Sequence, residues 1–347
     1  MTRMPTHRPT HVPTHVPTRL PARTARRHLT VPVVAALHVV GLAGLAAVVV
    51  LQDGGTAVLL TLGLTAYGLG LRHAFDPDHI ATIDNTTRRL VRTERDARGV
   101  GLWFSLGHST VVVVAAALLT LGVQALAPML DDDSSLLRRV TGVWGPLVAS
   151  TFLLVIGAVN VVLLRRALRS PTTAPDGVGG GPVSWLLRRF EWATDRPARM
   201  YGVGLLFGLG FDTATSIGLL AVAGAATLDQ SSWYAALPLA LLFAAGMSLL
   251  DSAQGAVARR VYVTAGARPT GRRRMRYDVL VTGVSAAAAL GIAVVTLVQT
   301  LAEHVPSAAA VPGASVDLAP YGVALTVVLV VAWGAGVLVL RQQRREA

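Results

Sequence analysis

Long apolar runs recur along this chain of 347 residues and constrain its fold more than any other feature. A helix of about 20 apolar residues is long enough to cross the hydrocarbon core of a bilayer. Such runs occupy residues 31–51, 56–83, 100–127, 141–164, 201–227, 233–258, 278–302 and 321–340. Only 14% of the residues are charged, against roughly 25% in a typical soluble domain. The sequence therefore predicts an all-α polytopic membrane protein with about eight transmembrane helices in a lipid bilayer.

The basic residues between the runs predict how the helices are oriented. All 31 are arginines, and 28 of them lie in the two tails and in the second, fourth and sixth connections. The connections predicted on the opposite side of the membrane carry only two arginines. Because cytoplasmic loops of membrane proteins are enriched in arginine, both termini are expected on the cytoplasmic side of the plasma (inner) membrane. The arginines alternate with apolar runs instead of gathering on a polar domain, so a nucleic-acid partner is not expected.

The composition of the connecting segments predicts the domain organisation. Residues 1–30 repeat Pro-Thr-His and lack an apolar period, which is typical of a disordered tail. Residues 165–199 contain a Gly- and Pro-rich stretch and are predicted to be a flexible cytoplasmic linker between two groups of four helices, 31–164 and 200–340, with 341–347 as a short basic tail. Gly-Leu and Phe-Asp pairs recur in the second and fifth helices, and a Phe-x-x-Gly-x-Ser pattern recurs in the third and sixth. These matches indicate an inverted repeat of helices 2–3 and 5–6.

Charged and imidazole side chains interrupt the predicted spans, although a charge at the centre of such a helix costs about 2.5 to 3.5 kcal/mol on insertion scales. One arginine, Arg72, faces five carboxylates. The full set is Arg72, His73, Asp76, Asp78, His79, Asp84, His108, Asp212 and Asp251. This excess of acids favours a bound cation, and imidazoles among carboxylates favour a divalent transition metal over sodium or potassium. The chain has no cysteine, so thiolate ligands are excluded.

The spacing in the second span predicts a shared face. On a regular helix His73, Asp76 and His79 lie on one stripe, and Asp84 returns to it. Pro77 is expected to kink or open the helix, because it removes a backbone donor and clashes with an earlier carbonyl. An opened turn would bring Asp78 inward and free backbone carbonyls, as in the broken helices of transporters.

Several of these residues have other interpretations. Asp76 follows Arg72 by four positions, so a role as the counterion of Arg72 is as well supported as a role as a metal ligand. His38 is a lone histidine on an apolar helix, where a packing role is the commoner one. His108 has small neighbours that permit close helix approach, so interhelical hydrogen bonding is an alternative to ligation.

Four ordered motifs resemble those of the nickel/cobalt transporter family of prokaryotic permeases. They are Arg-His-Ala-Phe-Asp-Pro-Asp-His-Ile at 72–80, Phe-Ser-Leu-Gly-His-Ser at 104–109, Leu-Gly-Phe-Asp-Thr-Ala-Thr at 209–215 and Gly-Met-Ser-Leu-Leu-Asp at 246–251. The resemblance implies metal ligation chiefly by His73, Asp78 and His79, with transport supported by His108, Asp212 and Asp251. It also implies that His38 and Phe75 influence the choice between nickel and cobalt. The chain departs from the family pattern at Pro77, Ser216 and Gln254, where the family usually has Ala, Glu and Asp.

The function predicted from these features is secondary transport of Ni²⁺ or Co²⁺, most simply uptake, with the metal as substrate and no cofactor. A nucleotide is not expected, because none of the usual ATP-binding sequence is present. Proton-driven efflux by the same scaffold is the alternative. An intramembrane metalloenzyme is a third class, but the chain has no His-Glu-x-x-His pair.

Overall fold

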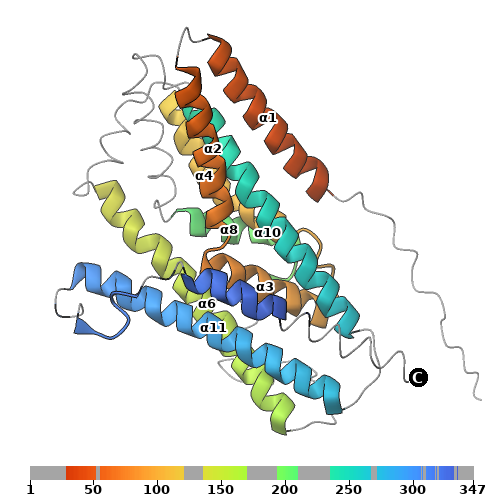
Figure 1. Cartoon of the computed structure of the whole chain (residues 1–347). Helices are drawn as coiled ribbons and strands as arrows, with labels where there is room; N and C mark the ends of the chain where they lie inside the picture. Colours follow the sequence, from red (N-terminus) through yellow and green to blue (C-terminus); the bar gives the residue numbers. More distant parts are fainter. Residues whose placement is uncertain are drawn as a thin grey trace, which may run out of the picture.

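The structure is a computed structural model that describes residues 29–51, 55–120, 136–169, 194–209, 235–266, 272–305, 307, 310–316, 318, 320–331 and 334. Its regular elements are helices, and no strand occurs within those ranges. They are α1 (Thr30–Leu51), α2 (Thr56–His73), α3 (Pro77–Arg92), α4 (Val100–Thr120), α6 (Leu136–Arg169), the short 3-10 helix η1 (Pro197–Arg199), α8 (Met200–Gly208), α10 (Ala236–Gly266) and α11 (Arg272–His304). A further apolar helix, Pro320–Val331, has no label in Figure 1.

The helices confirm the prediction of an all-α polytopic membrane protein. Five described helices are long and apolar enough to cross a membrane, and the number rises to six when the bent pair α2 and α3 is counted as one broken span. The predicted spans 201–227 and 321–340 are described only in part, and residues 170–193 of the predicted linker lie outside the described ranges. The total of eight helices, the domain boundaries and the inverted repeat therefore stay predictions.

The helix break at Pro77 is confirmed. α2 ends at His73, α3 begins at Pro77, and the two are bent by 53°. Asp76 between them is extended, with φ −63° and ψ 135°, as expected for a residue that precedes proline. Proline is well suited to the first turn of the new helix, because its missing N–H needs no partner there.

The length of α3 differs from the prediction, which ended the span at residue 83 and assigned the following residues to a cytoplasmic connection. The helix continues to Arg92, and its polar residues from Thr82 to Arg88 are buried, with Arg88 at 2% exposure. Hydrogen bonds within α3 and to α6 account for part of this burial. Arg88 Nη2 donates to Asn85 Oδ1 at 2.7 Å, and Asn160 Nδ2 of α6 donates to the same oxygen at 2.5 Å.

Asp84 is also placed differently from the prediction, which put it on the stripe of His73. Its carboxylate accepts hydrogen bonds from Tyr262 of α10 at 2.5 Å and from Ser285 of α11 at 3.0 Å. The prediction of a shared stripe is wrong for Asp84 because it assumed one regular helix, whereas the break changes the rotation of α3 relative to α2.

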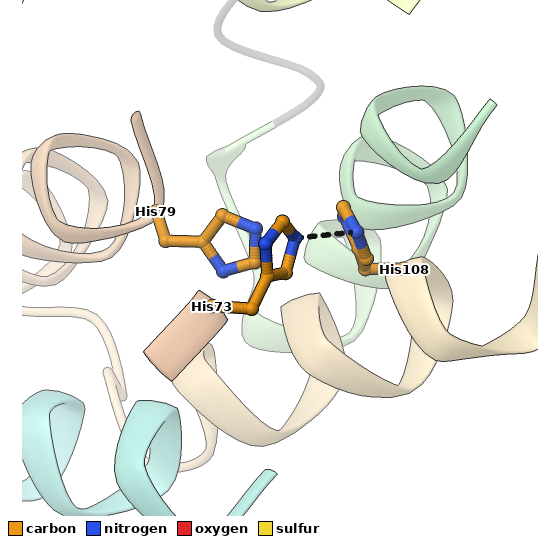
Figure 2. A group of neighbouring side chains, drawn as sticks. All are labelled: His73, His79 and His108. Carbon is orange, nitrogen blue, oxygen red and sulfur yellow. Dashed lines mark hydrogen bonds between the residues drawn. The ribbon is translucent and has the colours of Figure 1, made fainter. Parts of the chain in front are cut away.

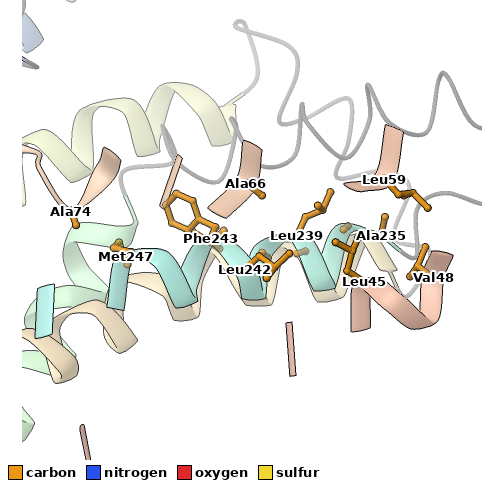
Figure 3. Close-up of a cluster of buried hydrophobic side chains, with 14 residues drawn as sticks. Leu45, Val48, Leu59, Ala66, Ala74, Ala235, Leu239, Leu242, Phe243 and Met247 are labelled. Atoms are coloured by element: carbon orange, nitrogen blue, oxygen red, sulfur yellow. The ribbon is translucent and has the colours of Figure 1, made fainter. Parts of the chain in front are cut away.

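α10 is the central helix of the larger apolar core. Leu239, Leu242 and Phe243 of α10 pack with Leu59 of α2 and Leu45 of α1, as Figure 3 shows. A second core joins α4, α6 and α8 around Phe104. The helices that bury these apolar cores also carry exposed apolar side chains on their outer faces. This is expected when the outer face of a helix contacts lipid.

Glycines let α4 approach its neighbours closely, as is common between membrane helices. A side chain at Gly101 would overlap the backbone of Asp251 in α10, and one at Gly204 of α8 would overlap the carbonyl of Phe104. These contacts fix α4 between α8 and α10. Near the helix break, a side chain at Gly70 of α2 would overlap the carbonyl of Phe243 in α10, so α2 also approaches α10 closely beside the candidate site.

Candidate metal site

Three histidines from three helices meet beside the helix break. His73 is the last residue of α2, His79 lies in the first turn of α3, and His108 lies in α4. One ligand nitrogen from each lies within 4.8 Å of the others. Figure 2 shows the three rings side by side, with His73 Nε2 at 3.1 Å from His108 Nε2. Three imidazole nitrogens within this distance are a donor set suited to a divalent transition-metal ion.

Two of these imidazoles carry buried nitrogens without a hydrogen-bond partner. His79 and His108 are 0% and 5% exposed, and the atoms concerned are His79 Nε2 and His108 Nδ1. A buried polar atom that makes no hydrogen bond costs about 1 to 3 kcal/mol, so such atoms call for an explanation. Coordination of a cation by His79 Nε2 would supply one.

Two carboxylates hold the other nitrogens of the cluster. Asp76 Oδ2 lies 2.5 Å from His73 Nδ1, and Asp251 Oδ2 of α10 lies 3.4 Å from His79 Nδ1. With Nδ1 of both rings held in this way, Nε2 of His73 and of His79 can face an ion. A carboxylate on the outer nitrogen of a metal-binding histidine orients the ring and raises its basicity. Asp76 is thus paired with His73, and its role as a metal ligand stays a prediction.

Asp78 lies next to the cluster without belonging to it. Its Oδ1 accepts a hydrogen bond from the backbone N–H of His79 at 2.9 Å, in the first turn of α3. A carboxylate there complements the unpaired N–H groups and the positive end of the helix dipole. The resemblance implied that Asp78 is a ligand, whereas the three clustered side chains are His73, His79 and His108.

The two selectivity candidates lie outside the histidine cluster. His38 of α1 is hydrogen-bonded through Nδ1 to the Val34 carbonyl oxygen at 2.8 Å and through Nε2 to the Tyr67 hydroxyl of α2 at 3.3 Å. Phe75 lies in the break itself and is partly exposed. Asp212 and Ser216 lie outside the described residues. Gln254 donates to the carbonyl of Ile80 at 3.3 Å, so it supports the first turn of α3.

Sequence reasoning did not select the polar residues after Asp84 on α3. Asn85 and Arg88 are buried and bonded to each other. The sequence signal for Arg88 was its spacing from Asp84. Arg88 follows Asp84 by four residues, and opposite charges one helical turn apart stabilise each other.

The broken span and the buried histidines place the chain in a class of proteins. These are polytopic membrane proteins with a site suited to a transition-metal cation. The chain belongs to the high-affinity nickel-transport protein family (NicO), whose model matches residues 59–339. The predicted resemblance to nickel/cobalt permeases is confirmed, and so is the prediction of a membrane transporter that is not an enzyme.

Named relatives cover most of the chain. It is 42% identical over 293 residues to the nickel transporter NicT of Mycobacterium tuberculosis, which covers 80% of this chain and 78% of the relative. It is 36% identical to the nickel transporter NixA of Staphylococcus aureus, over 79% of this chain and 81% of the relative. It is 37% identical to the cobalt transport protein NhlF of Rhodococcus rhodochrous, over 83% and 84%. No solved structure matches the chain.

Proposed function

We propose that this chain is an uptake permease that moves Ni²⁺ or Co²⁺ across the plasma membrane into the cytoplasm, with His73, His79 and His108 as the ligands of the transported ion. The observation that carries the proposal is the meeting of three imidazoles at a helix break, two of them almost fully buried. Broken helices near the membrane interior are where secondary transporters place their cation sites. The relatives named for nickel and cobalt transport support the choice of metal.

The surrounding charges fit a doubly charged substrate. When ionised, Asp76 and Asp251 supply two negative charges beside His73 and His79. The hydrated ion would exchange waters for imidazole nitrogens, whose borderline character suits nickel and cobalt. An inside-negative membrane potential favours entry of a cation by about 2.3 kcal/mol per charge per 100 mV, so uptake needs no nucleotide. Both termini in the cytoplasm, as the arginines predict, would direct α3 from the site toward the cytoplasm.

Asp251→Asn is expected to weaken nickel binding about 10- to 100-fold, because an amide orients His79 without raising the basicity of its ring. Equilibrium binding of Ni²⁺ to purified protein measures the change. Asp96→Asn, a carboxylate outside the membrane spans that binds Arg98, is the matched control and should bind like the wild type. An Asp251→Asn variant that binds nickel as tightly as the control would exclude Asp251 from the site.

The direction of transport is tested by radioactive nickel in cells that express the chain. We expect the cells to accumulate nickel above the level of cells with the empty vector, and cobalt to compete. A level below that of the empty vector, together with resistance to added nickel, would show efflux instead. Dissipation of the membrane potential should reduce the accumulation.

A further inference from the structure

Buried polar atoms without a partner are concentrated on α3. Among the described residues ten buried side-chain nitrogen or oxygen atoms make no hydrogen bond, and five of them belong to this one helix. They are His79 Nε2, Thr82 Oγ1, Thr86 Oγ1, Thr87 Oγ1 and Arg88 Nη1. An unbonded buried hydroxyl costs about 1 to 3 kcal/mol by mutational data, and three threonines in six residues share this cost. Such a concentration points to something other than packing.

Two of these threonines continue the line of His79 along α3. Thr82 and Thr86 follow it by three and seven residues, which places them on the same helix face, whereas Thr87 lies about 100° from Thr86. Both are 0% exposed. At 1.5 Å per residue the line extends about 10 Å from His79 toward the arginine-rich end of α3. It therefore begins at the histidine cluster and leads away from it.

The neighbours of this line are accounted for by other contacts. On one side Asn85 is bonded to Asn160 of α6, and on the other Ile83 belongs to the apolar cluster of α4, α6 and α8. Farther along, Arg89 donates to Thr194 at 2.9 Å. The hydroxyls of Thr82 and Thr86 thus have no partner among the described residues, although their neighbours on α3 have contacts of their own. Both hydroxyls lie between the histidine cluster and the end of the helix.

We infer that the face of α3 formed by Thr82 and Thr86 is the hydrated release path of the transported cation, from the histidine cluster to the cytoplasmic end of the helix. Hydroxyl oxygens hold the water shell of a Ni²⁺ or Co²⁺ ion and bind the ion itself weakly. A conduction path needs stations weak enough to let the ion leave, after a site strong enough to select it. The inference rests on the proposed function, because it gives the histidine cluster an exit.

Accessibility to a water-soluble reagent tests the path directly, since the chain contains no cysteine that would label in the background. Thr82→Cys and Thr86→Cys are compared with Ile83→Cys in inside-out membrane vesicles, using a charged methanethiosulfonate reagent. Ile83 is the matched control, because it is also 0% exposed and faces the apolar cluster. Each variant is also labelled after denaturation to show that its thiol is reactive.

We expect both threonine positions to react at least about tenfold faster than position 83, because a thiol ionises and reacts in water and not in an apolar core. Rates at positions 82 and 86 that equal the rate at position 83 would overturn the inference. Faster labelling in right-side-out than in inside-out vesicles would also overturn it, since the path would then open to the other side.

Transport separates a path from a packing role. Thr86→Val keeps the shape of the side chain and removes the hydroxyl, and Thr87→Val does the same one residue away and off the line. We expect nickel transport by Thr86→Val to fall about fivefold or more with equilibrium binding unchanged, and Thr87→Val to keep both. Equal transport by the two variants, or an equal loss of binding and transport in Thr86→Val, would contradict the inference.

His79→Ala is measured in the same experiment to separate the inferred path from the proposed function. If His79→Ala transports like the wild type, the proposed function fails. If His79→Ala is inactive while Thr86→Val transports like the wild type, only the inferred path fails.

Discussion

His79→Ala is expected to abolish accumulation of nickel and cobalt. His79 is fully buried, contacts both other histidines through its ring and is held by Asp251. Alanine removes one of three nitrogens from the cluster and leaves the Asp251 carboxylate without its partner. Loss of a buried partner of a charged group costs more than an ordinary hydrogen bond, so both ion binding and the local packing are lost. Radioactive nickel uptake by intact cells measures the effect.

Two comparisons separate this loss from poor folding. His79→Gln keeps a polar side chain of similar length at the start of α3 and should reach the membrane in normal amounts while it transports little. Thr61→Ala removes a hydroxyl on the exposed face of α2 that bonds only within its own helix, so its transport should match the wild type. Transport by His79→Ala at the wild-type rate per molecule in the membrane would remove the histidine cluster from the mechanism.

Gly204→Ala is expected to destabilise the protein strongly. The added methyl group would overlap the carbonyl of Phe104 and approach the backbone N of His108, so α4 and α8 must separate. Overpacking of this kind costs about 1 to 3 kcal/mol. It should lower the melting temperature of the protein in detergent and weaken nickel binding, because His108 moves with α4.

Gly202→Ala provides the matched control two residues earlier on the same helix. No atom lies within 4 Å of the position that its methyl group would take. Alanine is the better helix former by about 1 kcal/mol, so the melting temperature should stay the same or rise. Equal melting temperatures for the two variants would contradict the close approach of α8 and α4.

The break and most of the site could be predicted from local sequence. Pro77 predicted the opening between His73 and His79, because a proline inside a span breaks the hydrogen-bond pattern of the helix. The imidazoles were recognisable because polar groups are costly in an apolar run. His108 was identified, although spacing could not show that it lies beside His73, 35 residues away.

Contacts between distant segments could not be predicted. The pairing of His79 with Asp251 spans 172 residues, and no periodicity encodes it. The sequence left open whether Asp76 is the counterion of Arg72 or a metal ligand, and its pairing with His73 was not predicted. The end of α3 was misplaced because hydropathy counts Asp84 and Asn85 as polar whether or not a neighbouring helix pairs them. Asn160, Tyr262 and Ser285 supply those partners.

X-ray absorption at the nickel edge of purified protein with one equivalent of Ni²⁺ tests the histidine site most directly. We expect a nitrogen-rich first shell with the outer-ring scattering of coordinated imidazoles, and its loss when His73, His79 and His108 are replaced together by alanine. A shell of oxygen alone in the wild type, or the same spectrum in the triple variant, would show that these histidines do not hold the metal.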